Sequence, residues 1–489
     1  MVAVRSLRHH RFVGKKHPEG SIYEVKLRQV KLLKKMGWVE VVAEAEAIKA
    51  VKVVASADTS PAVSKQPALE CAFILGGGPS ISALDLGALD GQHVVAVNRS
   101  FETYPCTEMF FGDMSFFEEF GEKIMALALP KITVKHQLRD LPGVRAFRRA
   151  SDPKTLQRDL GQLINSNSGV MTLNYLLQRE CKLVVLLGMD LCETGGRKHH
   201  HDGYTHSSKP KSCEAMLNEW RGIRKQVWKN FDADIIHGTP GSALDEVEYL
   251  PLEDIVAALK DKDYFGGWWL PKGEKHFRMM LRKSRIVHGR KTYQYQKLSP
   301  AVDLVKDRKG IAIDVGSNVG FWAWHLAREF DCVHCFEPVP IHNECLRLNS
   351  RGMDNISIHE EALSDKRCEV ELLVYDGNCG ATHVNQDCSR EGETFTKVKS
   401  KCRTLDSYNF KSVKFLKIDC EGFELAVLKG AGKTLRKNSP VVVVEQKKEN
   451  ERFGLPSKGA VEYLESFGYV VRRVLAGDYI MVKGDTNGR

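Results

Sequence analysis

The residues best suited to chemistry lie in the C-terminal half, where a short apolar run leads into a glycine-rich turn. We expect a strand over 311–315, the turn Gly316-Ser317-Asn318-Val319-Gly320, and a helix over 321–330. Glycines there let the backbone bend tightly and approach a ligand without a Cβ clash. Glu337 follows 21 residues after Gly316, at the end of the next apolar run, where a carboxylate can accept hydrogen bonds from both hydroxyls of a ribose. Together these features indicate a cofactor that contains adenosine.

The residues around the turn also bear on which cofactor it is. A dinucleotide fingerprint has the spacing Gly-x-Gly-x-x-Gly, whereas this turn has Asp-x-Gly-x-Asn-x-Gly, beginning at Asp314. A carboxylate at this place repels a pyrophosphate and attracts a sulfonium or an ammonium group. S-adenosylmethionine therefore fits the sequence better than NAD.

Further motifs extend the pattern over about residues 300–483. With them, the sequence resembles the FkbM family of methyltransferases, which implies methyl transfer from S-adenosylmethionine, usually to a hydroxyl oxygen of a sugar or a similar polar metabolite. The motifs that carry the resemblance are Asp314 to Gly320, Phe336-Glu337-Pro338, Glu361-Ala362-Leu363-Ser364-Asp365, Thr404-Leu405-Asp406, Leu416-Lys417-Ile418-Asp419-Cys420-Glu421-Gly422, and Glu424 with Val427, Leu428, Lys429 and Gly430.

The resemblance also implies which residues bind the cofactor. They are Asp314, Gly316 and Asn318 at the methionine end, Gly320 in the same turn, Glu337 at the ribose, and Ala362 and Leu363 beside the adenine.

The candidate catalytic residues follow later strands. Asp419 and Glu421 are implied to lie at the end of the fourth strand, where we expect Asp419 to orient the acceptor or the cofactor; a cap on the following helix is the alternative. Methyl transfer needs an aligned displacement and a group that takes the hydroxyl proton. His383 is a candidate for that base because imidazole titrates near neutrality, although a loop histidine bonded to backbone or water is the competing interpretation. Glu445 ends another strand and could line the same pocket.

A second glycine-rich turn lies in the N-terminal half, between the apolar run 71–75 and a predicted helix. Backbone amides at such a turn suit a phosphate, and Ile81 stands where a dinucleotide fingerprint has its third glycine, which disfavours NAD. Over about residues 70–250 the sequence resembles the domain shared by 6-hydroxymethylpterin pyrophosphokinase-like proteins, Maf-type glycosyltransferases and bacterial sialyltransferase-like enzymes, which implies a nucleotide-linked donor, such as a nucleotide-sugar. The expected nucleotide-binding residues are Gly76, Gly77, Gly78, Pro79, Ser80, Asn98, Asn167, Ser168 and Gly169.

The sequence also contains a histidine-rich stretch and a pair of closely spaced cysteines, which are residue types that bind metals. His199, His200, His201 and His206 lie in a polar stretch that could bind a metal, supply a base or form an exposed lid. Cys332 and Cys335 have zinc-type spacing, but no second pair accompanies them, and their run is typical of a buried strand. We therefore expect no metal site.

Alternation of apolar runs with amphipathic stretches predicts an α/β protein with two Rossmann-like domains, mostly parallel sheets and a small N-terminal appendage. The expected parts are a basic appendage and linker (1–65), a nucleotide-binding, glycosyltransferase-like domain (66–260), a basic connecting segment (261–309) and the methyltransferase domain (310–489). The 489 residues are too many for one core, and the charge of +10 is concentrated in 272–309 (+9) and 1–40 (+7).

The composition narrows the class of protein. With 43% hydrophobic and 27% charged residues and no apolar run of bilayer length, we expect a cytoplasmic protein without a membrane span. The fusion of modules also resembles, in style, proteins encoded by bacteriophages. The favoured function is a methyltransferase that O-methylates a sugar or another polar hydroxyl, fused to a nucleotide(-sugar)-binding domain. The alternative is a non-enzymatic nucleic-acid-binding or assembly factor that uses residues 272–309, with a degenerate methyltransferase fold.

Overall fold

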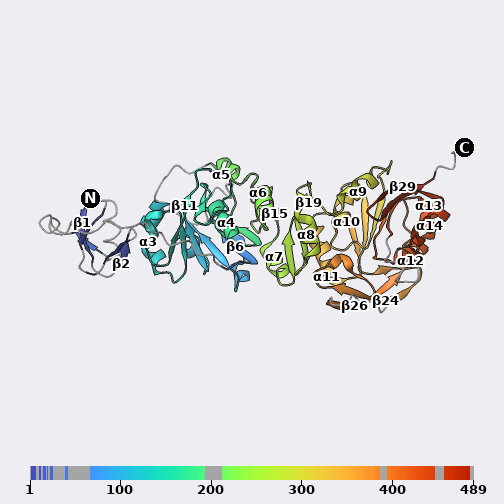
Figure 1. Ribbon diagram of the computed structural model, residues 1–489, viewed down its shortest axis with the longest axis horizontal. Coiled ribbons are helices and arrows are strands. Elements are labelled where there is room, and N and C mark those ends of the chain that lie inside the picture. The colour runs from blue at the N-terminus through green and yellow to red at the C-terminus, as the bar shows by residue number, and fades with distance from the viewer. Residues whose placement is uncertain are drawn as a thin grey trace. The chain divides into compact units, whose positions relative to one another are not determined.

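The computed structural model (Figure 1) describes residues 67–192, 212–385, 394–446 and 456–484, together with the short stretches 2–6, 10–12, 15–17, 19, 22–25 and 39–41. Its contacts divide the chain into two compact units, Met1–Ala257 and Ala258–Arg489. Each unit is described by itself.

Unit 1 begins with short antiparallel strands. A three-stranded sheet has the order β4-β1-β5, and β2 pairs with β3. Their bounds are β1 Val2–Ser6, β2 His10–Phe12, β3 Lys15–His17, β4 Ile22–Val25 and β5 Val39–Val41.

The main part of unit 1 is an eight-stranded sheet of order β10-β9-β8-β7-β6-β13-β14-β15, in which every neighbouring pair is parallel. Its central strands are short apolar runs, as expected for a parallel sheet covered on both faces. The chain order reverses between β6 and β13, which makes this the switch point of the sheet. The bounds are β6 Cys71–Leu75, β7 Val94–Val97, β8 Glu108–Phe111, β9 Lys131–Thr133, β10 Val144–Ala146, β13 Leu183–Leu187, β14 Asp234–His237 and β15 Glu248–Tyr249, with α3 Met114–Ala126, α4 Ser168–Gln178, α5 Cys213–Trp220, α6 Ile223–Asn230 and α7 Leu252–Ala258.

Unit 2 contains a seven-stranded sheet of order β22-β21-β20-β27-β28-β30-β29, whose switch point lies between β20 and β27. The first five strands are parallel, whereas β30 is antiparallel to both neighbours. The predicted α/β class with mostly parallel sheets is therefore confirmed. The bounds are β20 Ile311–Val315, β21 Cys332–Phe336, β22 Ile356–His359, β27 Val413–Ile418, β28 Val441–Glu445, β29 Tyr469–Leu475 and β30 Asp478–Lys483, with α10 Phe321–Leu326, α11 Pro340–Asn349, α12 Glu424–Lys429, α13 Gly432–Asn438 and α14 Gly459–Ser466.

A smaller sheet of order β23-β26-β24-β25 lies beyond β22 in the sequence and is mostly antiparallel. It brings Ala362 and Leu363 to the same part of unit 2 as the ends of the main strands. The bounds are β23 Ala362–Leu363, β24 Cys368–Tyr375, β25 His383–Val384 and β26 Phe395–Arg403.

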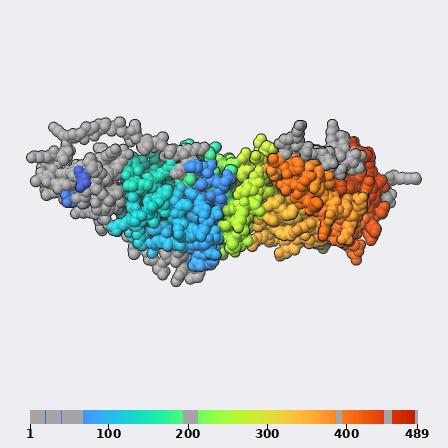
Figure 2. Space-filling model, turned by 90° about the horizontal axis from the view of Figure 1, so that it is seen from below, coloured from blue at the N-terminus to red at the C-terminus, as the bar shows by residue number. Residues whose placement is uncertain are grey.

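The basic stretch before β20 was expected to be a connecting segment, but the structure folds it into unit 2. Trp268, Phe277 and Leu298 are buried in one cluster with Phe321 and Trp324 of α10. In Figure 2 the surface of these residues runs without a break into that of the following strands. The net charge of this stretch gave no indication that its apolar residues are buried. The bounds are β16 Lys262–Phe265, β17 Trp268–Pro271, α8 His276–Arg282, β18 Ile286–Val287, β19 Arg290–Lys291 and α9 Tyr295–Val302.

The cysteines and the helices of the described part of the chain bear on two of the expectations. Its cysteines all carry free thiols, and Cys332 and Cys335 both lie on β21, in agreement with a strand rather than a zinc pair. Among the same residues, no helix has the length and apolarity needed to span a bilayer.

Candidate cofactor and active site

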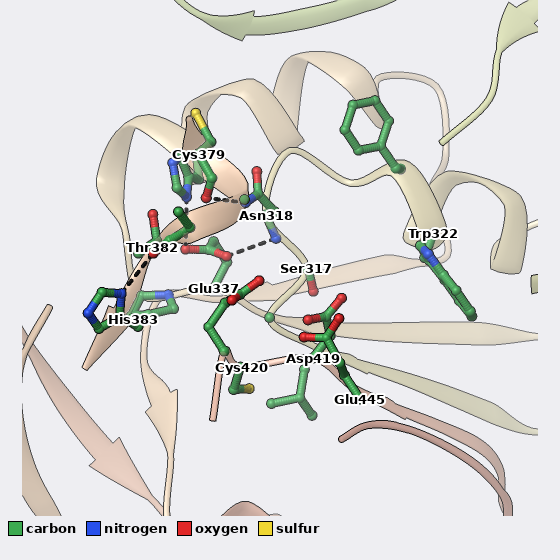
Figure 3. Close-up of a pocket in the computed structure, with 18 of the residues that line it drawn as sticks. Ser317, Asn318, Trp322, Glu337, Cys379, Thr382, His383, Asp419, Cys420 and Glu445 are labelled. Atoms are coloured by element: carbon green, nitrogen blue, oxygen red, sulfur yellow. Dashed lines mark hydrogen bonds and ion pairs between the residues drawn. The ribbon is translucent and has the colours of Figure 1, made fainter. Parts of the chain in front are cut away.

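A cavity of about 410 Å³ lies at the carboxyl ends of β20, β21, β27 and β28 in unit 2 (Figure 3). Open α/β sheets bind ligands at this edge, next to the switch point. The volume is in the range of small-molecule and cofactor sites. Nine of the sequence-predicted residues line it: Gly316, Asn318, Glu337, Ala362, Leu363, His383, Asp419, Glu421 and Glu445.

The glycine turn brings the ends of the two switch-point strands into contact. Gly316 has φ 73°, and a Cβ there would lie 1.9 Å from the carbonyl oxygen of Asp419. Gly320 has φ 92°, and its Cβ would meet Leu346 at 2.4 Å, so it fixes the start of α10 and does not line the cavity. Only glycine combines a left-handed backbone with such close approach.

Glu337 is buried at the end of β21, and its two oxygens hold the loops on either side. One oxygen accepts a hydrogen bond from the amide of Asn318 (2.8 Å), and the other accepts from the amide of Val339 (3.0 Å) and lies 3.3 Å from Nδ1 of His342. An ionised carboxylate has about four acceptor positions. Glu337 therefore positions the glycine turn and keeps capacity for hydroxyl donors in the cavity.

Asp314 lies beneath the cavity and not in its lining. Its carboxylate is fully buried, and Lys417 Nζ lies 3.1 Å from its Oδ1. Burial raises the pKa of Asp314, and the charge of Lys417 opposes this increase. The structure thus places Asp314 in a buried ion pair and outside the cavity lining, whereas the sequence implied a direct cofactor contact.

Lys417 connects both switch-point strands and received no role from the sequence. Its Nζ donates to the carbonyl of Gly316 (2.8 Å) and lies 3.8 Å from Oδ2 of Asp419. Burial lowers the pKa of Lys417, but the charges of Asp314 and Asp419 outweigh it and hold the pKa above its ordinary value. Lys417 therefore stays a cation at the base of the cavity.

Three carboxylates gather on the β27 and β28 side. Oxygens of Asp419, Glu421 and Glu445 all lie within 4.8 Å of one another, and Figure 3 shows Asp419 and Glu445 side by side. The pKa of the Tyr293 phenol is raised above its ordinary value, mainly by burial and to a smaller extent by the charges of these three carboxylates. Such oxygens can accept a hydroxyl hydrogen, take a proton, or hold a cation.

His383 lies on β25, on another part of the lining. It is buried, its Nδ1 lies 2.8 Å from the carbonyl of Ala381, and its ring stacks on Tyr375 with centroids 5.5 Å apart. Figure 3 shows it separated from Asp419, with Glu337 between them. The backbone contact is the competing interpretation given above, so a role as base stays a prediction.

The remaining walls are apolar and aromatic. Ala362 and Leu363 line the cavity together with Phe336, Leu372 and Val384, so this part of the wall is apolar. Opposite Glu337 in Figure 3 lies Trp322, whose Nε1 donates to Oε1 of Gln294 at 3.1 Å. No sequence motif predicted this wall, which is formed by His276, Phe277, Met280, Tyr293, Gln294 and Trp322.

The glycine turn of unit 1 packs in a different way. The amide and Oγ of Ser80 donate to the two oxygens of Asp190, at 2.9 and 2.5 Å. A Cβ at Gly78 would lie 2.1 Å from Oδ1 of Asp190, and one at Gly76 2.5 Å from the carbonyl of Gly188. An internal carboxylate thus takes the Ser80 amide that the sequence had assigned to a phosphate.

The other expected nucleotide-binding residues lie at the same edge of unit 1. Asn98 has φ 54°, and its Oδ1 has no hydrogen-bond partner among the described residues. Asn167 caps α4 by accepting from the amide of Val170 (3.0 Å) and donates to Glu219 (2.6 Å). Ser168 and Gly169 form the first turn of α4. The histidine-rich stretch 199–206 lies outside the described residues.

A doubly wound sheet with a cavity at its switch point has the architecture in which open α/β sheets bind ligands, and the comparisons with known proteins indicate the class. Residues 314–471 match a family model described as Methyltransferase FkbM domain. This match supports a methyltransferase domain in unit 2, and the fold is consistent with a Rossmann-like methyltransferase.

The solved structures that are similar to this chain include two methyltransferases. One is a methyltransferase FkbM from Methylobacillus flagellatus KT, with 13% identity and TM-score 0.27 over 85% of this chain and 90% of that chain. The other is a precorrin-6y C5,15-methyltransferase from Geobacter metallireducens GS-15, with 11% identity and TM-score 0.24 over 39% of this chain and 90% of that one. No curated protein matches the chain. The family match, and not these superpositions, carries the assignment.

Proposed function

We propose that unit 2 is an S-adenosylmethionine-dependent methyltransferase that methylates a hydroxyl oxygen of a sugar or a similar polar acceptor. The observation that carries this proposal is the single cavity edge shared by the Gly316 turn, Glu337 and the three carboxylates around Asp419. The donor set fits the cofactor: a carboxylate for ribose hydroxyls, an apolar slot for adenine and negative charge for a sulfonium and an ammonium group.

When bound, S-adenosylmethionine supplies an electrophilic methyl group. The protein's own residues then have to place the acceptor oxygen in line with that methyl and accept the proton that the hydroxyl loses. Asp419, fixed beside Lys417, orients the acceptor, and the adjacent carboxylates of Glu421 and Glu445 are within reach of a proton from the same hydroxyl. His383 is the alternative base. Trp322 and Tyr293 exclude water and offer flat faces to a sugar ring.

Unit 1 is proposed to bind a nucleotide or nucleotide-sugar at its switch point. The cytoplasmic location of the protein stays a prediction. Support for a nucleotide comes from Asn98, which follows β7, and from Asn167 and Ser168 at the start of α4. Ser168 lies beside Gly112 at the end of β8. Because Asp190 already takes the Ser80 amide, we place the ligand over these side chains and not in the glycine turn.

The test is calorimetry with S-adenosylmethionine on the wild type, on Glu337→Ala and on the control Glu360→Ala. We expect micromolar-class binding that is at least about tenfold weaker in Glu337→Ala, since a pair of charge-assisted hydrogen bonds contributes roughly 1.5–3 kcal/mol. Glu360 is an exposed acid of the same unit that pairs with Arg347 outside the cavity, so its loss should leave binding unchanged. Equal affinities in all three proteins, or salt-sensitive RNA binding without cofactor binding, would refute the proposal.

A further inference from the structure

One wall of the cavity comes from residues that precede the family match. Helix α8 contributes His276, Phe277 and Met280, although the match begins at residue 314. This wall is fixed by hydrogen bonds: the amide of Lys275 donates to the carbonyl of Gly377 (3.0 Å), and the amide of Cys379 donates to Glu274 (2.7 Å). Helix α8 is therefore a built part of the site and suited to select the acceptor.

The interior of the cavity and this wall carry opposite charge. Inside, Asp419, Glu421 and Glu445 stand together, and the buried cation Lys417 already lies between Asp314 and Asp419. An anionic group is repelled from this interior, whereas a hydroxyl finds several acceptors there.

The α8 side is strongly cationic. Between 272 and 291 the chain has eight Lys or Arg residues and one acid, Glu274. Glu274 is 4% exposed, and its two oxygens accept the amides of Phe277 (2.8 Å) and Cys379. Lys275, Arg282 and Lys283 are exposed.

Two of the exposed lysines, Lys275 and Lys283, lie close in sequence to residues that line the cavity. Met280 lines the cavity and is also 45% exposed, so it marks the opening. Lys283 lies three residues further on, as the exposed residue that follows the last turn of α8. Lys275 adjoins the lining residue His276, and no ion pair of the described residues involves Lys275 or Lys283.

We propose that the acceptor is a phosphorylated sugar, with its hydroxyl among the carboxylates and its phosphate held at the mouth by Lys275 and Lys283. Two lysines at one opening favour a group with more than one negative charge, which distinguishes a phosphate from a carboxylate. Neutral saccharides lack this contact. This inference rests on the proposed methyltransferase function.

The experiment is calorimetry at low and high salt with glucose, glucose 1-phosphate and UDP-glucose, after saturation with S-adenosylhomocysteine. We expect a phosphorylated probe to bind at least about tenfold tighter than glucose in low salt and to lose most of that advantage in high salt. In the double variant K275A/K283A the advantage should fall below about threefold. The control K366A/K437A removes two exposed lysines outside the cavity lining and should behave as the wild type.

The outcomes separate this inference from the function on which it rests. If S-adenosylhomocysteine itself does not bind, the methyltransferase proposal fails. If it binds, the inference is overturned when neither phosphorylated probe exceeds glucose, when K275A/K283A keeps the full advantage, or when an RNA oligonucleotide binds in their place. Preference for UDP-glucose alone indicates a nucleotide-linked acceptor, and equal binding of both probes indicates that the phosphate itself is recognised.

Discussion

Each unit has a glycine-rich turn after the first strand of its main sheet, and in both units this turn packs against the loop beyond the switch point. In unit 1 the turn after β6 meets Gly188 and Asp190, and in unit 2 the turn after β20 meets Asp419. Both contacts exclude a side chain. Gly76, Gly78 and Gly316 are therefore required by packing, before any ligand is considered.

The two units differ in where the aspartate of the second loop points. Asp190 turns back and accepts hydrogen bonds from Ser80, whereas Asp419 faces the cavity beside Glu445. A glycine-rich turn in the sequence thus indicates close packing at the switch point, not a ligand site as such. The orientation of the neighbouring acid is what distinguishes a filled anion position from an open ligand site.

The largest expected effect comes from breaking the unit 2 contact with Gly316→Ala. The new Cβ meets a backbone oxygen and the left-handed φ adds strain, so we expect unit 2 to lose about 3–5 kcal/mol of stability. Gly78→Ala in unit 1 is the matched variant, where the nearest atom belongs to a side chain that can move. Equilibrium denaturation compares them, and a smaller loss in Gly316→Ala than in Gly78→Ala would contradict the account.

A second prediction concerns Glu424, which bonds back to the loop that carries Asp419. Its Oε1 accepts the amides of Cys420 (2.9 Å) and Gly422 (3.0 Å), and burial raises its pKa from 4.5 to about 7. Between these pH values the folded chain keeps a proton that the unfolded chain loses, so stability falls as pH rises, by about 3 kcal/mol from this group. Denaturation at pH 4.5 and 7.5 should show that Glu424→Gln lacks this decline. If Glu424→Gln shows the same fall in stability with pH as the wild type, the raised pKa of Glu424 is not its cause.

Asp419→Asn tests the acid that faces the cavity. Removing its charge should leave the fold intact and lower methyl transfer about 100-fold, which corresponds to about 2.7 kcal/mol of barrier. The readout is turnover to S-adenosylhomocysteine with the acceptor identified by the probes above. Unfolding is followed in parallel. A variant that loses stability but keeps its turnover per folded molecule would make Asp419 structural, like Asp190.

Asp190→Asn is the converse variant and has the smallest expected effect. It weakens the hydrogen bonds to Ser80, and we expect unit 1 to lose about 1.5 kcal/mol without any change in cofactor binding by unit 2. Denaturation and calorimetry on the same sample measure both. Weakened cofactor binding in this variant would mean that the cofactor uses unit 1.

The sequence predicts much of unit 2 because its signals are local. Strands β20 and β21 are mostly apolar, each with one polar residue, and the turn and Glu337 follow them directly, so their meeting at one sheet edge is a consequence of parallel pairing. The wall made by α8 and Trp322 was not predictable in this way. Its residues look like a charged segment in sequence, and only folding over long separations buries Trp268 and Phe277 against α10.

Asp314 and Ser80 show the other limit. Both have a residue type that suits a ligand, and both instead lie against partners 103 and 110 positions away: Asp314 forms an ion pair with Lys417, and Ser80 donates to Asp190. Spacing along the chain carries no information about such partners. A residue's type predicts what it can bind, and its long-range neighbours decide whether it does.

The most direct test of the difference between the two units is the stoichiometry of S-adenosylmethionine binding, measured by calorimetry on the wild type, Glu337→Ala and Asp190→Asn. The account predicts one molecule per chain in the wild type and in Asp190→Asn, and strongly weakened binding in Glu337→Ala. Binding that survives in Glu337→Ala but disappears in Asp190→Asn would show that the cofactor site is in the other unit.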